Sequence, residues 1–169
     1  GAESSVPLVA VHDNLIVTRS LSKSHALAGM RVGYAIAQAD LIEGLSRVKD
    51  SFNSYPLDAV AQAAATAAIE DRQWFKQASQ SVRDVREAMG AGLNAIGFEV
   101  LPSHGNFIFT QHKSLPGKQI FDALRARDIL VRRWDKKRIE NWLRISVGTM
   151  SQAEQLLVVM REIVSAETG

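Results

Sequence analysis

Hydrophobic and polar positions along the first 70 residues predict short strands followed by helices. Two apolar, β-branched runs, at 15–18 and 32–37, have the composition of strands. The polar segment between them is expected to form a turn. Two helices are expected to follow, at about 40–50 and 59–69, with Asp58 in position to cap the alanine-rich second one.

A helical period dominates the middle of the chain. From Trp74 to about Ile96, apolar residues recur at steps of three or four, with charged residues between them. This pattern predicts one long amphipathic helix that ends at Gly97. The apolar stripe consists of Phe75, Ala78, Val82, Val85, Met89, Leu93 and Ile96.

The remaining residues predict a compact α+β unit. The spacing of Ser151 and Glu154 is that of a capping box, which places the start of the last helix there. The other expected elements are strands at 98–101, 107–110, 129–131 and 142–147, and a helix at 117–127.

Composition excludes several classes of protein. The 169 residues carry a formal net charge of +2, which is too small to indicate nucleic-acid binding. The chain has no cysteine and its four histidines lack metal-ligand spacing, so we expect no disulfide and no metal site. No apolar run is long enough to cross a bilayer, so we expect no membrane partner and a cytoplasmic location. The chain begins with Gly1 and not Met, which we interpret as a removed tag or as part of a longer protein.

The most informative segment lies between the first two strands. It reads Ser20-Leu21-Ser22-Lys23-Ser24, and Leu-Ala-Gly-Met-Arg31-Val-Gly33-Tyr follows at 27–34. The segment combines a primary amine, neighbouring hydroxyls and a planar, permanent cation. A desolvated lysine amine can attack an aldehyde, whereas hydroxyls and a guanidinium are ligands for phosphate. By itself, Ser-x-Ser-Lys is more often a solvated surface loop; the whole string favours a cofactor site.

This string resembles the lysine motif of the class I/II, fold-type I aminotransferases, and most closely that of the histidinol-phosphate aminotransferase branch. The resemblance implies pyridoxal 5'-phosphate as cofactor and Lys23 as the catalytic Schiff-base lysine and general base. It also implies that Ser20, Ser22 and Arg31 bind the cofactor phosphate. The family activity is transfer of an amino group between an amino acid or amino alcohol and a 2-oxo acid.

A second candidate site lies in Leu143-Arg144-Ile145-Ser146-Val147-Gly-Thr. Alternation places Arg144 and Ser146 on the face opposite Leu143 and Ile145. A structural salt bridge or an exposed face would also explain the arginine. The resemblance implies instead that Arg144 binds the substrate carboxylate.

A second arginine is implied near the phosphate end of the substrate. It matches Arg132, although the adjacent Arg133 is an alternative, because one residue changes the face of a strand.

The resemblance also implies an incomplete subunit. The family's aspartate and tyrosine in Asp-Glu-Ala-Tyr, and the ring that stacks on the cofactor, would precede Gly1. We therefore expect the C-terminal part of the transferase fold, with mixed α/β and α+β character. Residues 1–72 would be the rest of the large cofactor-binding domain and residues 73–169 the linking helix and the small domain. A homodimer is implied for the whole enzyme, and little activity for this chain alone.

Several alternatives remain open. A decarboxylase of a phosphorylated amino acid, or an aromatic aminotransferase, would share the same lysine and arginine motif. A member of a different class, a non-catalytic α+β interaction module, would explain the missing residues without a longer subunit.

Overall fold

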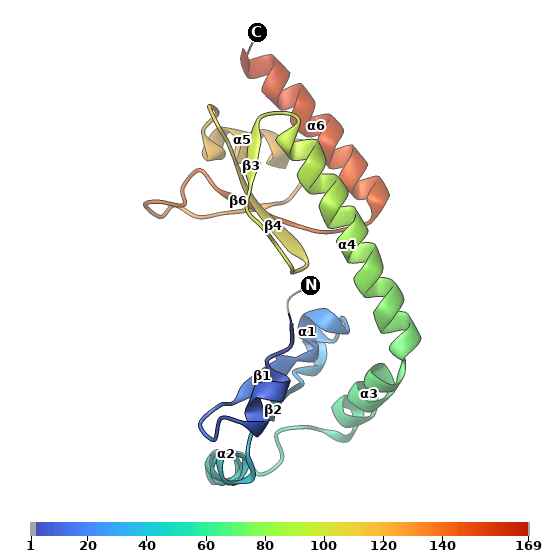
Figure 1. Ribbon diagram of the computed structural model, residues 1–169. Helices are drawn as coiled ribbons and strands as arrows, with labels where there is room; N and C mark the ends of the chain where they lie inside the picture. The colour runs from blue at the N-terminus through green and yellow to red at the C-terminus, as the bar shows by residue number, and fades with distance from the viewer. Residues whose placement is uncertain (1–2, 169) are drawn as a thin grey trace. The chain divides into compact units, whose positions relative to one another are not determined.

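The computed structural model describes residues 3–168, which fall into two compact units (Figure 1). Unit 1 covers Gly1–Gln77 and unit 2 covers Ala78–Gly169, so the division lies five residues after the boundary expected at 72. The long helix α4 (Arg72–Asn94) contains the division. The assignment of the units to a large and a small domain stays a prediction.

Unit 1 is built around a two-stranded antiparallel ribbon. Ser20 at the end of one strand pairs with Gly33 at the start of the other. The elements, in order, are the 3₁₀ helix η1 (Val6–Ala10), β1 (Val17–Ser20), α1 (Leu21–Ser24), the 3₁₀ helix η2 (Ala28–Met30), β2 (Gly33–Ile36), α2 (Ala39–Phe52) and α3 (Ala59–Glu70).

The segment expected to be a polar turn contains one turn of helix. Ser20 caps α1, because its Oγ accepts a hydrogen bond of 3.2 Å from the backbone N–H of Ser22. The turn prediction missed α1 because a single helical turn is too short for its apolar residues to show a period. The cap predicted at Asp58 is confirmed, since its carboxylate accepts from Ala61 N at 2.8 Å.

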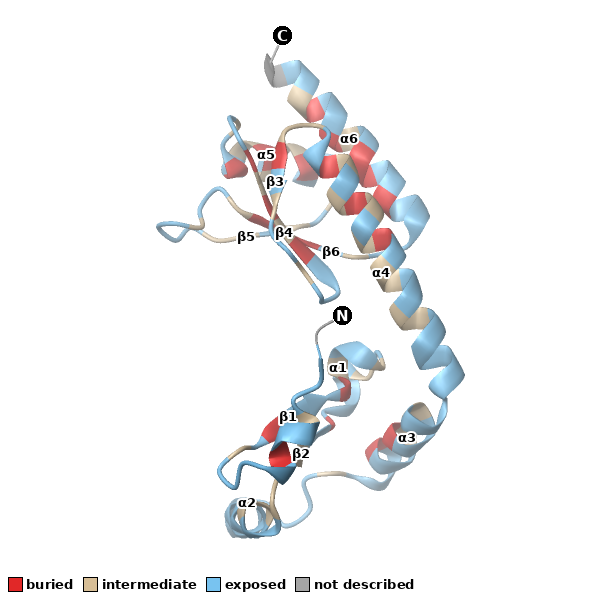
Figure 2. Cartoon of the chain, in the orientation of Figure 1, coloured by how far each residue is buried: buried red, intermediate tan, exposed pale blue. Residues whose placement is uncertain are grey.

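The buried core of unit 1 is small. It consists of Leu21, Val32, Ala61 and Ala65, against which Leu27 and Leu57 pack. Within the described residues, many apolar side chains of unit 1 are exposed, among them Leu45, Val48 and Phe52 of α2. Helix α2 has no buried residue (Figure 2). Unit 1 therefore has more apolar surface than its own core can cover.

Unit 2 is a four-stranded antiparallel sheet with helices, in the strand order β3-β4-β6-β5. Its elements after α4 are β3 (Phe98–Val100), β4 (Phe107–His112), α5 (Gly117–Arg125), β5 (Arg132–Arg133), β6 (Leu143–Ser146) and α6 (Met150–Thr168). The sheet and three helices confirm the expected α+β character of this part of the chain.

The core of unit 2 lies between the sheet and helices α4, α5 and α6. Figure 2 shows buried residues on these helices and on the sheet, and burial alternates along β4 and β6. Val85, Met89 and Leu93 of the predicted stripe on α4 are each at most 3 % exposed. This half of the stripe therefore faces the core, as its period predicted, whereas Phe75 near the start of the stripe is 39 % exposed.

The long helix was expected to end at Gly97, but α4 ends at Asn94, and Gly97 closes the turn that follows it. Its φ is +88°, a conformation that other residues rarely adopt. A Cβ there would also lie 2.8 Å from Nε2 of His112. Nδ1 of this buried histidine accepts backbone N–H bonds from Ser114 and Leu115, which closes the turn after β4.

Two of the expected elements of unit 2 were misplaced. The strand predicted at 129–131 is found at 132–133, because the N–H of Ile129 is used to close α5 through the carbonyl of Leu124. The final helix begins at Met150, one residue before the predicted cap. Its capping box is the reciprocal pair Thr149 and Gln152, each side chain accepting from the other's backbone N–H.

Across the part of the chain that the structure describes, no helix has both the length and the apolar composition that a membrane span requires.

The packing of α4 gives a first prediction. Leu93→Ala should lower the free energy of unfolding by about 2–5 kcal/mol, because it leaves a cavity in the core of unit 2. Leu93 is 0 % exposed, whereas Leu130 is 80 % exposed and supplies the matched control, Leu130→Ala. Urea unfolding followed by tryptophan fluorescence measures both, since Trp134 and Trp142 lie in unit 2. Equal losses in the two variants would contradict the assigned core.

Candidate functional site

The candidate cofactor residues lie in one segment of unit 1, at the end of the ribbon where β1 and β2 are joined. Lys23 is in α1 and is exposed. The backbone around it is fixed by Leu21, whose N–H donates to the carbonyl of Val32 and whose own carbonyl accepts from Leu27. Leu21 is 2 % exposed, so the lysine stands on a turn anchored in the core.

Of the three serine hydroxyls beside the lysine, two are used locally and one is available to a ligand. The hydroxyl of Ser20 donates to Oγ of Ser22 at 2.9 Å. Among the described residues, the hydroxyl hydrogen of Ser22 has no acceptor, so it is available to a ligand oxygen. The hydroxyl of Ser24 is used locally, because it lies 3.1 Å from the carbonyl of Ser20 and 2.9 Å from Nδ1 of His25.

Arg31 supplies the cation of this segment. Its Nη1 donates to the carbonyl of Ala28 at 3.3 Å, and it has no ion pair within residues 3–168. Its φ is +56°, a left-handed conformation that is uncommon for an arginine. The contact between α1 and η2 joins the lysine turn to the segment that precedes Arg31.

Position 33, two residues after Arg31, has no room for a side chain. A Cβ on Gly33 would lie 2.9 Å from the carbonyl oxygen of Arg19, which is closer than real Cβ atoms approach a backbone oxygen. Gly33 therefore permits the close pairing of β1 with β2 next to Ser20.

The second candidate site lies on one face of the sheet of unit 2. Leu143 and Ile145 of β6 are buried in the core, and Arg144 and Ser146 alternate with them, as the sequence predicted. Arg144 is directly opposite Arg132 on β5. Two guanidinium groups therefore occupy neighbouring positions on the face away from the core.

Aromatic rings surround these two cations. The guanidinium carbon of Arg144 lies 5.4 Å from the ring of Phe107 and 5.5 Å from that of Trp134. The guanidinium carbon of Arg132 lies 5.2 Å from the same Trp134 ring. Phe109 meets Trp134 edge to face, with 6.0 Å between the ring centroids. Within residues 3–168, neither guanidinium group makes an ion pair or a hydrogen bond to another residue.

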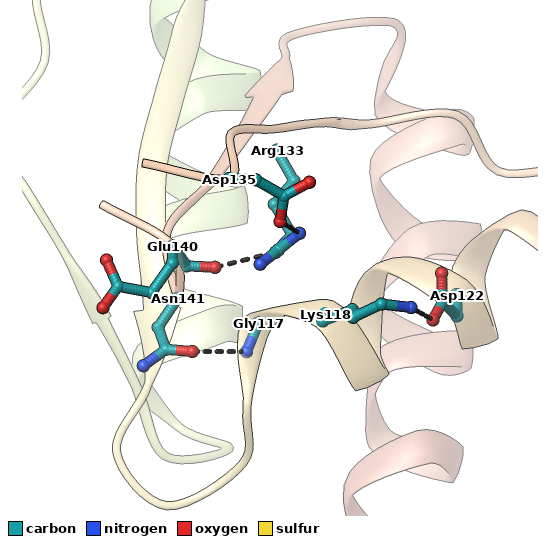
Figure 3. A network of polar contacts seen from close by, with 7 residues as sticks. All are labelled: Gly117, Lys118, Asp122, Arg133, Asp135, Glu140 and Asn141. Carbon is teal, nitrogen blue, oxygen red and sulfur yellow. Dashed lines mark hydrogen bonds and ion pairs between the residues drawn. The ribbon is translucent and has the colours of Figure 1, made fainter. Parts of the chain in front are cut away.

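The neighbouring Arg133 has a different environment (Figure 3). Its Nη1 lies 2.5 Å from a carboxylate oxygen of Asp135, and its Nε donates to the carbonyl of Glu140 at 2.7 Å. The side chain is only 11 % exposed. Arg133 therefore stabilises the 133–140 segment, and of the two adjacent arginines only Arg132 has its guanidinium without a polar partner in the described chain.

The same close-up shows how the loop before β6 is fixed. The side-chain carbonyl of Asn141 accepts from the backbone N–H of Gly117 at 3.1 Å, at the start of α5 (Figure 3). A Cβ on Gly117 would lie 2.4 Å from the backbone oxygen of Asn141. This contact holds the loop that precedes β6, and therefore Arg144, against the start of α5.

Sequence reasoning missed the aromatic residues of the second site. Phe107 and Phe109 are two apart on β4, as Arg132 and Trp134 are two apart on β5 and its continuation. The period of two places each pair on one face, so this signal was available in the sequence.

The predicted site residues are divided between the two units. Unit 1 contains Ser20, Ser22, Lys23 and Arg31, and unit 2 contains Arg132 and Arg144.

Comparison with known proteins extends these observations. The family model "Aminotransferase class I and II" matches residues 1–160. Histidinol-phosphate aminotransferase 1 of Bradyrhizobium diazoefficiens is 54% identical over 164 residues, which are 97% of this chain and 47% of that protein. The chain thus spans about half the length of the curated relatives it matches.

Solved structures share the fold. The histidinol-phosphate aminotransferase from Clostridium acetobutylicum matches with a TM-score of 0.87 at 22% identity, over 96% of this chain and 49% of that one. The Sinorhizobium meliloti enzyme, solved in complex with pyridoxal-5'-phosphate, matches with a TM-score of 0.80 at 24% identity, over 92% and 42%. The predicted fold class is thereby confirmed. With a family model that matches nearly its whole length, the chain belongs to the class I and II aminotransferases.

Proposed function

We propose that this chain is the lysine-bearing part of an aminotransferase that moves an amino group between histidinol phosphate and a 2-oxo acid such as 2-oxoglutarate. The observation that carries the proposal is 54% identity, along 97% of the chain, with a histidinol-phosphate aminotransferase. The two arginines without polar partners on the sheet of unit 2 support an anionic substrate, because such cations are suited to carboxylate or phosphate.

The residues of unit 1 fit pyridoxal 5'-phosphate. The free hydroxyl hydrogen of Ser22 and the guanidinium of Arg31 would bind its phosphate, with Ser20 holding the Ser22 hydroxyl in place. Within residues 3–168, Lys23 has no ion pair, so its amine is available to the cofactor's aldehyde. When bound, the cofactor supplies the electron sink for charge that develops on the substrate carbon.

Lys23 would have two tasks in turn. Its Nζ would hold the cofactor covalently when no substrate is bound. With substrate present, the free Nζ would act as general base and acid toward the proton on the substrate carbon. Both tasks require Nζ to stay close to one place, and proton transfer requires it to lie within hydrogen-bond distance of the group that gives or takes the proton. The hydrogen bonds that anchor the backbone of α1 support this.

Arg144 and Arg132 would orient the substrates. Arg144 would bind the carboxylate of the amino acid, and Arg132 would lie near the phosphate of histidinol phosphate. A guanidinium can make two parallel hydrogen bonds to either anion, which fixes the direction of the substrate and not only its position. Aromatic rings lie beside both guanidinium groups and would cover one side of each.

The whole protein would place these groups in one subunit. We propose that unit 1 belongs to a large cofactor-binding domain and unit 2 to a small C-terminal domain, within a cytoplasmic homodimer. The exposed apolar residues of α2 support burial against further protein. Ser54 and Tyr55, in the loop after α2, are then candidates to approach the cofactor of the other subunit; Tyr55 is 91 % exposed.

The activity itself is the first test. Full-length protein containing this chain should convert histidinol phosphate and 2-oxoglutarate to glutamate and the corresponding oxo compound. The rate is measured as the formation of glutamate. Phosphothreonine and aromatic amino acids serve as comparison substrates. A higher kcat/KM for an aromatic amino acid, or release of carbon dioxide, would assign the protein to one of the related activities instead.

Lys23 is tested by substitution. Lys23→Ala in the full-length protein should lower kcat by about 10³-fold or more, because both the covalent anchor and the proton carrier are removed. The visible absorbance of bound cofactor should shift as well. Lys49→Ala is the control, since Lys49 is an exposed lysine of unit 1 that pairs with Asp50. Retention of activity and absorbance by the Lys23 variant would refute its assignment.

Arg144 is tested by a charge-conserving change. Arg144→Lys should raise the KM for glutamate by roughly 10- to 100-fold, because lysine cannot reproduce the two parallel hydrogen bonds. Cofactor absorbance should be unchanged. Arg125→Lys, at the exposed end of α5, is the control. An unchanged KM in the Arg144 variant would assign this arginine a structural role.

A further inference from the structure

We propose that Trp134 is a positioning residue for the substrate: its indole holds the guanidinium groups of Arg132 and Arg144 side by side and ready for an anion. The proposal rests on the proposed function, in which these arginines bind the substrates. Its basis is that one ring contacts both cations, at 5.2 Å and 5.5 Å from their guanidinium carbons.

The pairing of the strands creates the need for such a residue. Arg132 and Arg144 are direct cross-strand partners on β5 and β6, and like charges in this position repel each other. Without a compensating group, the two side chains would turn apart into solvent. The negative face of an aromatic ring attracts a guanidinium and lowers this repulsion without neutralising either charge.

Carboxylates do not take this role in the described chain. Asp135 is the nearest acidic residue in sequence to Arg132, and its carboxylate pairs with Arg133. A carboxylate between the two arginines would compete with an anionic substrate. An indole compensates the cations and leaves their N–H groups free for a ligand, which is what a substrate site requires.

The backbone explains why Trp134 reaches both arginines. It lies two residues after Arg132, directly after the end of β5, and the guanidinium of Arg132 lies over its ring, whereas Arg133 bonds to the carbonyl of Glu140. Phe109, which is opposite Arg144 on β4, meets the indole edge to face and restricts its rotation. The ring is therefore held in position by the sheet and not only by the arginines.

The test compares two substitutions of similar size in the full-length enzyme. Trp134→Phe keeps an aromatic face, and Trp134→Leu fills the space without one. Trp134→Leu should raise the KM for histidinol phosphate and for glutamate by about tenfold, with kcat within twofold of wild type. Trp134→Phe should raise these KM values much less than Trp134→Leu does, because it keeps an aromatic face. A residue needed only for packing would affect both variants alike.

Trp142 provides the matched control. It stacks on Phe109 with 4.9 Å between the ring centroids, and within residues 3–168 its ring makes no cation–π contact with either guanidinium. Trp142→Leu should leave both KM values within twofold of wild type. The proposal is overturned if Trp134→Leu and Trp142→Leu raise KM equally, if Trp134→Leu lowers kcat alone, or if Trp134→Phe gives no recovery.

A binding measurement separates this proposal from the proposed function. Titration of the full-length protein with inorganic phosphate, followed by calorimetry, should give a dissociation constant about tenfold higher for Trp134→Leu than for Trp134→Phe. If the wild-type protein has no aminotransferase activity but this difference is found, the proposed function fails and the role of Trp134 stands. Equal phosphate affinity in the two variants overturns the role of Trp134, whatever the activity.

Discussion

The alternation of side chains along β6 is the constraint on which the second site depends. Leu143 and Ile145 must face the core, since both are buried against the helices of unit 2. Arg144 is then forced onto the opposite face, and the register with β5 brings Arg132 beside it. The apolar core on one side of the sheet thus determines the cationic surface on the other. A shift of one residue in this register would place a guanidinium in the core, where its burial without a partner is strongly unfavourable.

The first site depends on local hydrogen bonds more than on a large core. Leu21 supplies one buried side chain, and its backbone bonds to Val32, directly before β2, and to Leu27, directly before η2. This arrangement holds Lys23 outside the core but on a fixed backbone. Such a combination is suited to a covalent attachment point, because the amine is accessible while its origin is constrained. The limited core of unit 1 also explains why exposed apolar residues remain on α2.

The sequence predicted the elements with a clear period and missed those without one. The core-facing half of the α4 stripe and the face of Arg144 were predicted correctly, whereas α4 ends at Asn94, three residues before the predicted end at Gly97. Helix α1 was missed, because four residues cannot display a helical period. The start of β5 was misplaced, since it depends on how α5 ends and not on hydrophobicity. The lysine motif was found by resemblance to a family, whereas the role of Trp134 required the pairing of two strands distant from one another in sequence.

The central claim is that Lys23 is the residue that holds pyridoxal 5'-phosphate. The most direct measurement is borohydride reduction of the full-length protein with bound cofactor, followed by digestion and mass spectrometry of the peptides. The account predicts the reduced cofactor on Lys23, in a peptide that begins at Ser20 and ends at Arg31, because trypsin does not cleave at a modified lysine. Attachment of the cofactor to a different lysine, or no stable attachment at all, would contradict it.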